Sequence, residues 1–138
     1  MEIKIVKQLT GEILDYIQNK YDTLENFKDH SVNLDSFGKI LEHSDVFIVR
    51  SLDGSIKALM VTNLCTSFLD NKIRTLSLIA MVSDSNRASV MLLRLFIDMG
   101  NKFADHVLMS KGVSTNLKHS TLVKLGFKPL ETVYKMEV

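Results

Sequence analysis

The sequence has one cysteine, one proline and no long hydrophobic run. A single cysteine cannot form a disulfide within the chain, so a disulfide framework is excluded and a reducing compartment is favoured. The longest apolar stretch, Leu76 to Val82, is far shorter than the ~20 residues that a membrane helix needs. The first residues, Met1 to Lys4, lack the apolar core of a signal peptide. We therefore expect a cytoplasmic protein and no membrane interaction.

The chain also lacks an excess of charge of either sign. Its 17 basic and 16 acidic residues give a net charge of +1, which provides no overall attraction to nucleic acid. No H-x-x-x-H or C-x-x-C spacing occurs among the histidines and the cysteine, so we expect no metal site. A length of 138 residues, 46% of them hydrophobic, suits one globular domain over residues 1–138.

The central stretch predicts a strand over residues 73–82, a polar turn over 83–86 and a long amphipathic helix over 87–104. Each of the four small polar turn residues could cap the helix by accepting hydrogen bonds from its first N–H groups. The wide apolar face of the helix suits packing on a sheet. A strand that leads into a helix N-terminus also offers free N–H groups and a favourable dipole to an anion.

The rest of the chain predicts further strands and helices at shorter spacing. Asp53-Gly54 indicates a hairpin turn, Gly126 indicates a left-handed helix C-cap, and Gly100 is expected to interrupt the long helix or to end its regular part. The further strands are expected at residues 3–7, 45–50, 56–64, 107–110 and 128–137, and the further helices at 10–21, 33–41 and 116–125. The order β-α-α-β-β-β-α-β-α-β implies a mixed sheet covered by helices.

With these residues in view, the chain resembles the GNAT superfamily of acyl-coenzyme A-dependent N-acyltransferases over nearly its whole length. The resemblance implies an α/β fold with a mixed, mostly antiparallel sheet and helices on both faces. It also implies acetyl transfer from acetyl-CoA to a primary amine, of a small molecule or a protein, by direct attack in a ternary complex. Four segments carry it: the hairpin 47–59, the strand and turn 76–87, the helix through Leu95 and Phe96, and Leu125-Gly126-Phe127 with the strand after it.

The resemblance places a pyrophosphate loop, R/Q-x-x-G-x-G/A, at the start of the long helix. Arg87 falls on the Arg/Gln position, while Val90 and Leu92 fall on the two small positions. Side chains at those positions can block the approach of a pyrophosphate to the backbone. Asp84 stands where the family usually has Pro, and its charge would repel phosphate unless it points away. The cofactor contacts implied by the resemblance are Met81, Val82, Asn86, Arg87, Ala88, Val90, Leu92 and Asn116.

A narrower resemblance, to small GNAT-like proteins of tailed bacteriophages, rests on Asn116, His119 and the Leu125-Gly126-Phe127 ending. In the wider family a Tyr on the fourth helix often protonates the leaving thiolate, and Leu122 occupies that position here. His119 and Ser120 are the catalytic candidates that remain on this helix.

Two more candidates are Tyr134, which could donate a proton to the leaving thiolate, and Cys65, which could act as a nucleophile. Each candidate also has a structural explanation. The structural explanations are an exposed residue of a capped helix for Arg87, an exposed residue at a helix start for His119, a structural residue for Tyr134 and a thiol in a loop for Cys65. Two hypotheses of function therefore stay open. The first is the acyltransferase. The second is a catalytically inactive GNAT-fold protein that binds a protein partner, encoded by a phage and present in the host cytoplasm or the virion. A homodimer also stays open.

Overall fold

The computed structural model describes residues 1–23, 34–66, 69–109, 118–130, 134, 136 and 138. The helices and strands follow the order expected from the sequence as far as the fourth helix. They are β1 (Glu2–Ile5), α1 (Gly11–Thr23), α2 (Leu34–His43), β2 (Asp45–Arg50), β3 (Ile56–Thr66), β4 (Arg74–Ser83), α3 (Asn86–Phe103), β5 (His106–Met109) and α4 (His119–Lys124).

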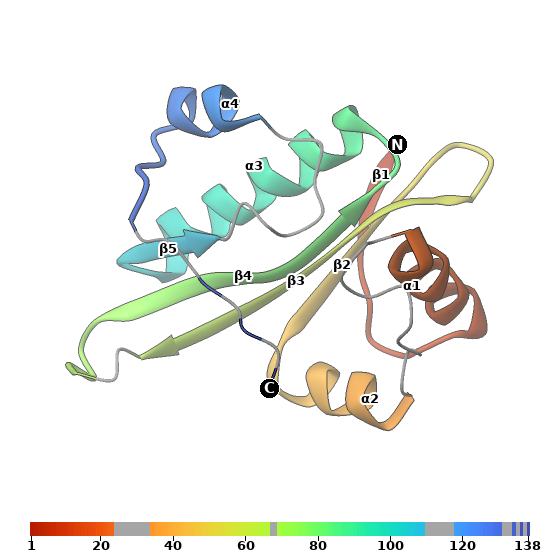
Figure 1. Ribbon diagram of the computed structural model, residues 1–138, viewed down its shortest axis with the longest axis horizontal. Helices are drawn as coiled ribbons and strands as arrows, with labels where there is room; N and C mark the ends of the chain where they lie inside the picture. The colour runs from red at the N-terminus through yellow and green to blue at the C-terminus, as the bar shows by residue number, and fades with distance from the viewer. Residues whose placement is uncertain (24–33, 67–68, 110–117, 131–133, 135, 137) are drawn as a thin grey trace.

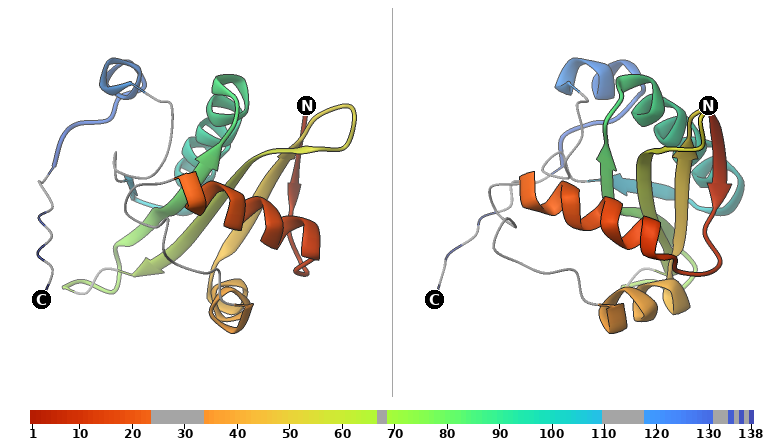
Figure 2. Two further views of the ribbon diagram at one scale, coloured as in Figure 1. Left: turned by 45° about the vertical axis from the view of Figure 1, so that its right-hand side comes forward. Right: turned by 90° about the vertical axis from the view of Figure 1, so that its right-hand side faces the viewer.

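The five strands form one sheet in the order β1-β2-β3-β4-β5. Neighbouring strands are antiparallel except β4 and β5, which are parallel because α3 connects them as a crossover. Helices α1 and α2 lie on one face of the sheet, while α3 and α4 lie on the other (Figures 1 and 2). This arrangement confirms the α/β fold with a mixed, mostly antiparallel sheet and helices on both faces.

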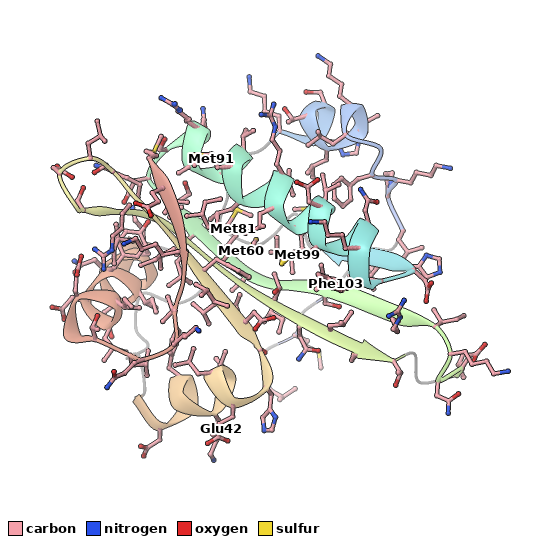
Figure 3. The ribbon with its side chains drawn as sticks, turned by 180° about the vertical axis from the view of Figure 1, so that it is seen from behind. Glu42, Met60, Met81, Met91, Met99 and Phe103 are labelled. Atoms are coloured by element: carbon pink, nitrogen blue, oxygen red, sulfur yellow. The ribbon has the colours of Figure 1, made fainter. Side chains whose placement is uncertain are left out.

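Alternation along β3 and β4 produces one apolar core on each face of the sheet. Met60 and Met81 belong to the core beneath α3, whereas Val61 and Val82 belong to the core beneath α1 and α2. All four side chains are at most 5% exposed. The view from behind shows Met60 and Met81 between the sheet and α3 (Figure 3). The two cores hold α1 and α3 at fixed distances from the sheet that lies between them.

Both turns expected from glycine are confirmed. Gly54 has φ +87° in the β2–β3 hairpin, and Gly126 has φ +98° immediately after α4. At the end of α4 the Phe127 N–H donates to Leu122 O and the Gly126 N–H donates to Val123 O, both at 3.0 Å. These two bonds form a Schellman motif, in which the left-handed residue is usually glycine because it has no Cβ.

The expectation that Gly100 ends or interrupts the long helix was wrong. Helix α3 continues through Gly100 to Phe103, and Gly100 is buried. A Cβ at this position would overlap the Cγ1 atom of Val107 on β5. Glycine is therefore needed for the close approach of the helix to the strand and not for a break in the helix.

The C-terminal strand expected over residues 128–137 is absent from the part of that segment that the structure describes. Residues 128–130, 134 and 136 have no strand structure, and residues 131–133, 135 and 137 lie outside the described residues. Leu130 is 77% exposed and Tyr134 is 89% exposed. The alternating pattern predicted a strand, but a strand also needs a paired neighbour and a buried face, and these side chains have no buried face.

Candidate functional site

The centre of the site is β4, which contains an extra residue relative to β3. Val61 pairs with Ala80 and Thr62 pairs with Leu78, so Ile79 has no partner of its own and forms a β-bulge. The bulge reverses which side chains face which core: Leu78 and Met81 both face α3, although they are three residues apart.

Strand β5 pairs with β4 only before the bulge. Thr75 pairs with His106 and Leu78 pairs with Met109, which is the last residue of β5. Within the residues that the structure describes, β4 has no neighbouring strand on that edge from Ile79 to Ser83. The second half of β4 therefore keeps one edge available for a ligand and leads directly to the start of α3.

The turn between β4 and α3 forms a helix cap, as its small polar residues predicted. Ser85 is the N-cap residue, and its Oγ accepts a hydrogen bond from the Ala88 N–H at 3.3 Å. Ser83 Oγ donates to Ser85 O at 2.7 Å and accepts from the Ser85 N–H at 3.1 Å. Helix α3 begins at Asn86, because Ser85 supplies the cap at that point.

The first two N–H groups of α3 remain unpaired among the residues that the structure describes. Asn86 and Arg87 supply these groups, since the next one, on Ala88, donates to Ser85. Free N–H groups at a helix N-terminus carry partial positive charge and favour an anion. The positions that would contact an anion through their N–H groups are therefore 86 and 87.

Replacing Ser85 with alanine is expected to destabilise the protein by about 1 kcal/mol, because the Ala88 N–H loses its acceptor. The free energy of unfolding measured in urea would test this expectation. Ser85→Asp is the matched control, since a carboxylate also caps a helix and should preserve stability. An alanine variant as stable as the original chain would contradict the assigned cap.

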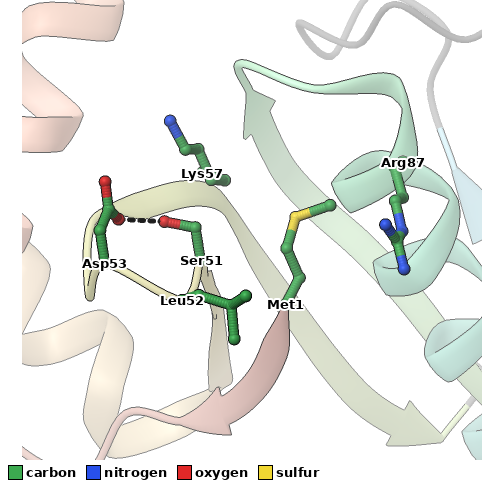
Figure 4. A pocket seen from close by; sticks show the side chains of 6 residues that line it. All are labelled: Met1, Ser51, Leu52, Asp53, Lys57 and Arg87. Carbon is green, nitrogen blue, oxygen red and sulfur yellow. Dashed lines mark hydrogen bonds between the residues drawn. The ribbon is translucent and has the colours of Figure 1, made fainter.

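The Arg87 side chain lines an open hollow between α3 and the β2–β3 hairpin. The hollow has a volume of ≈ 420 Å³ and is lined by Met1, Ser51, Leu52, Asp53, Lys57 and Arg87. Lys57 and Arg87 stand on either side of Met1 (Figure 4). Neither cation has an ion-pair partner among the residues that the structure describes. The side chain of Arg87 thus adds positive charge close to the two free N–H groups.

The acid in this hollow is already occupied by hydrogen bonds. Asp53 accepts from the Ser51 hydroxyl, from the Ser55 N–H at 2.9 Å and from the Ser55 hydroxyl at 2.7 Å. These bonds, with the Ser51 hydroxyl as the largest cause, hold the pKa of Asp53 well below its usual range.

Arg50 at the end of β2 forms an ion pair with Glu12 of α1 at 2.6 Å, and it lowers the pKa of Glu12.

Asp84, at the position where the family usually has Pro, forms an ion pair with Lys20 of α1. The Lys20 and Asp84 side chains are 24% and 37% exposed, so the pair is partly shielded from water. The Lys20 Nζ atom also lies 5.8 Å from the centre of the Tyr16 ring. No local sequence pattern predicts this pair, because the two residues lie on elements far apart in the chain.

The structure places the two residues at the family's glycine positions outside the capping turn. Leu92 is fully buried in the core beneath α3, and Val90 is half-buried and packs against the same core. Among the other expected cofactor contacts, the Met81, Val82 and Ala88 side chains are at most 5% exposed. A ligand would meet these three residues through the backbone.

The expected catalytic residues lie on the surface. His119 and Ser120 are exposed in the first turn of α4, and neither side chain forms a hydrogen bond among the described residues. Leu122, which replaces the family's Tyr, is 7% exposed and belongs to the core beneath α3. Asn116 lies outside the described residues.

Two other candidates are also exposed. Tyr134 is 89% exposed, and Cys65, expected in a loop, lies near the end of β3 with an exposed thiol. The part of the chain that the structure describes contains no group of three His, Cys, Asp or Glu residues that could hold a metal ion. None of its helices is long and apolar enough to cross a membrane.

Comparison with solved structures shows the fold to be that of the GNAT acetyltransferases. A Trypanosoma brucei acetyltransferase superposes with a TM-score of 0.70 at 14% identity, covering 99% of this chain and 100% of its own. The acetyltransferase AAC(6')-Iy, in complex with a bisubstrate analogue of CoA and acetylneamine, superposes with a TM-score of 0.67 at 16% identity, covering 100% and 99%. A Bacillus halodurans transcriptional regulator superposes with a TM-score of 0.72 at 10% identity, covering 99% and 100%. No protein-family model and no curated protein sequence matches the chain.

Proposed function

We propose that this chain is an acyl-coenzyme A-dependent N-acyltransferase that uses acetyl-CoA. The observation that carries the proposal is the joining of three features on one strand of a GNAT fold. Strand β4 has a bulge at Ile79, has no described neighbour on one edge after it, and ends at a capped helix with free N–H groups on Asn86 and Arg87. An extended ligand with a diphosphate fits a strand edge that ends at a helix N-terminus.

The residues at the end of β4 have separate roles in this proposal. The Asn86 and Arg87 N–H groups bind the diphosphate, and the Arg87 guanidinium adds charge near it. The backbone of Met81 and Val82 pairs with the amide groups of the pantetheine arm. The side chains of Val90 and Leu92 pack in or against the core between α3 and the sheet, and in this proposal they make no contact with the coenzyme.

The chemistry is a direct transfer between two bound substrates. The nitrogen of a neutral primary amine attacks the thioester carbonyl carbon, a C–N bond forms and the C–S bond breaks. The amine proton passes to water, and the leaving thiolate takes up a proton. Holding the two reactants together supplies most of the rate. His119 or Ser120, on the surface of α4, is the proposed donor to the thiolate.

Binding of acetyl-CoA is expected to raise the melting temperature, because a ligand that binds only the folded state stabilises it. At a ligand concentration 100 times Kd the gain is about 2.7 kcal/mol, which corresponds to several degrees. Differential scanning fluorimetry with S-acetylcysteamine as the control ligand measures this shift, because that thioester lacks the nucleotide.

Arg87→Ala is the matched variant for the same measurement. Arg87 is exposed and lies outside both cores, so its removal should reduce the shift and leave the melting temperature without ligand unchanged. An absence of any shift at millimolar acetyl-CoA would refute the proposed transferase.

A second proposal, a binding protein that has lost catalysis, is favoured by the surroundings of Leu122. This residue is buried in the core and cannot supply a proton, and β4 contains no carboxylate between Arg74 and Ser83. The two proposals differ in one measurement. A transferase consumes acetyl-CoA in the presence of a panel of primary amines, whereas an inactive chain leaves the thioester intact with every amine.

A further inference from the structure

Asp84 poses an electrostatic problem for any anion at the start of α3. Its carboxylate precedes the cap residue Ser85 and lies two residues before the first free N–H group. A carboxylate at this point has two unfavourable options for phosphate binding. It could itself accept hydrogen bonds from the free N–H groups, or it could repel a diphosphate that binds them.

The structure shows a third arrangement. The Asp84 N–H donates to Lys57 O at 2.8 Å, which attaches the turn to β3. The cap is supplied by Ser85, so the Asp84 side chain has no part in it. The carboxylate instead forms its ion pair with Lys20 of α1. The charge of Asp84 is thus matched by a cation from another element, and the Asn86 and Arg87 N–H groups stay unpaired among the described residues.

The position of Lys20 is set by the packing of α1. Ile13 and Ile17 bury α1 against the sheet at 3% and 4% exposure, and Lys20 extends beside the ring of Tyr16. Burial raises the pKa of Tyr16 to about 12, so the phenol stays neutral at physiological pH and does not compete with Asp84 for the ammonium. The Lys20 ammonium therefore lies beside both the Asp84 carboxylate and the Tyr16 ring, a favourable environment for a cation.

We propose that Lys20 is a positioning residue for coenzyme binding: it directs the Asp84 carboxylate away from the α3 N-terminus and cancels its charge, so that a diphosphate can occupy the free N–H groups. This inference rests on the proposed function and deepens it. It adds a residue of α1 to a site that is otherwise formed by β4 and α3. It also explains how the chain accepts an acid where the family usually has Pro.

Isothermal titration with coenzyme A, applied to the full chain and to four variants, tests the inference. Lys20→Ala should weaken binding roughly five-fold, the effect expected for one uncompensated charge near a helix N-terminus. Lys20→Ala combined with Asp84→Asn should recover the affinity of the original chain, because the carboxylate is gone as well. Asp84→Asn alone should bind at least as tightly as the original chain. Lys102→Ala, at the far end of α3, is the control for loss of a lysine.

The pattern of recovery separates electrostatics from loss of structure. A merely structural role for Lys20 predicts that the double variant stays as weak as Lys20→Ala, and that result would overturn the inference while the proposed function stands. Equal binding by Lys20→Ala and the original chain would overturn it too. If Asp84→Asn binds coenzyme A and the original chain does not, Lys20 fails to neutralise the acid, and the inference is overturned. If neither the original chain nor Asp84→Asn binds, the proposed function and this inference are both wrong.

Discussion

A variant in which Val90 and Leu92 are both glycine is expected to lose most of its folding stability and to gain no coenzyme site. From the sequence, the two side chains could have blocked a pyrophosphate loop. In the structure Leu92 is fully buried and Val90 packs against the same core. Truncating a buried Leu costs about 2–5 kcal/mol, and each glycine inside a helix costs about 1 kcal/mol more. This loss approaches the whole stability of many domains, about 5–15 kcal/mol.

Urea denaturation followed by circular dichroism measures this effect. Val90→Ala is the control, because it trims a half-buried side chain and preserves helix propensity. We expect the double glycine variant to unfold at a much lower urea concentration than this control. A double variant that is as stable as the original chain, and that binds acetyl-CoA more tightly, would show that the two side chains obstruct the site.

Replacing Gly100 with alanine is expected to destabilise the protein by about 2 kcal/mol, although alanine is the better helix former. The added Cβ would overlap Val107 Cγ1, and Val107 is β-branched and belongs to a paired strand, so its side chain has little freedom to move. Overpacking of this kind costs about 1–3 kcal/mol. Thermal and urea unfolding of the variant measure the change.

Two further variants serve as controls for Gly100. Gly38→Ala in α2 adds a Cβ with no atom within 4 Å, so it should stabilise the chain by about 0.5–1 kcal/mol. Val107→Ala combined with Gly100→Ala removes the overlapping atom and should recover part of the loss. If Gly100→Ala is as stabilising as Gly38→Ala, the close approach of α3 and β5 is wrong.

Sequence patterns with a local physical cause predicted the structure well. The Asp53-Gly54 turn, the Gly126 cap and the polar turn before α3 were all identified from residue types whose backbone or hydrogen-bonding behaviour is intrinsic. The limits of most helices and strands were predicted to within a few residues for the same reason.

Features that depend on contacts between distant segments were missed. The role of Gly100 depends on Val107, which only the folded chain brings close. The neutralisation of Asp84 depends on Lys20, which lies on α1 and is distant from Asp84 in the sequence. The bulge at Ile79 has no glycine to mark it. The strand expected over residues 128–137 is absent from its described part. Its local pattern alternates as in a strand, but its side chains have no buried face there.

The extra residue in β4 constrains how this sequence can vary. Leu76 and Leu78 face one core before the bulge, and Met81 faces the same core after it only because Ile79 shifts the phase of the strand. A deletion at Ile79 would remove the bulge and leave a regularly alternating strand, in which Met81 still faces α3 and Val82 still faces α1. The loss of one residue is therefore tolerable near residues 70–72, outside the paired strands, and at Ile79, whereas one residue inserted into the paired part of β4 would exchange the side chains that face the two cores.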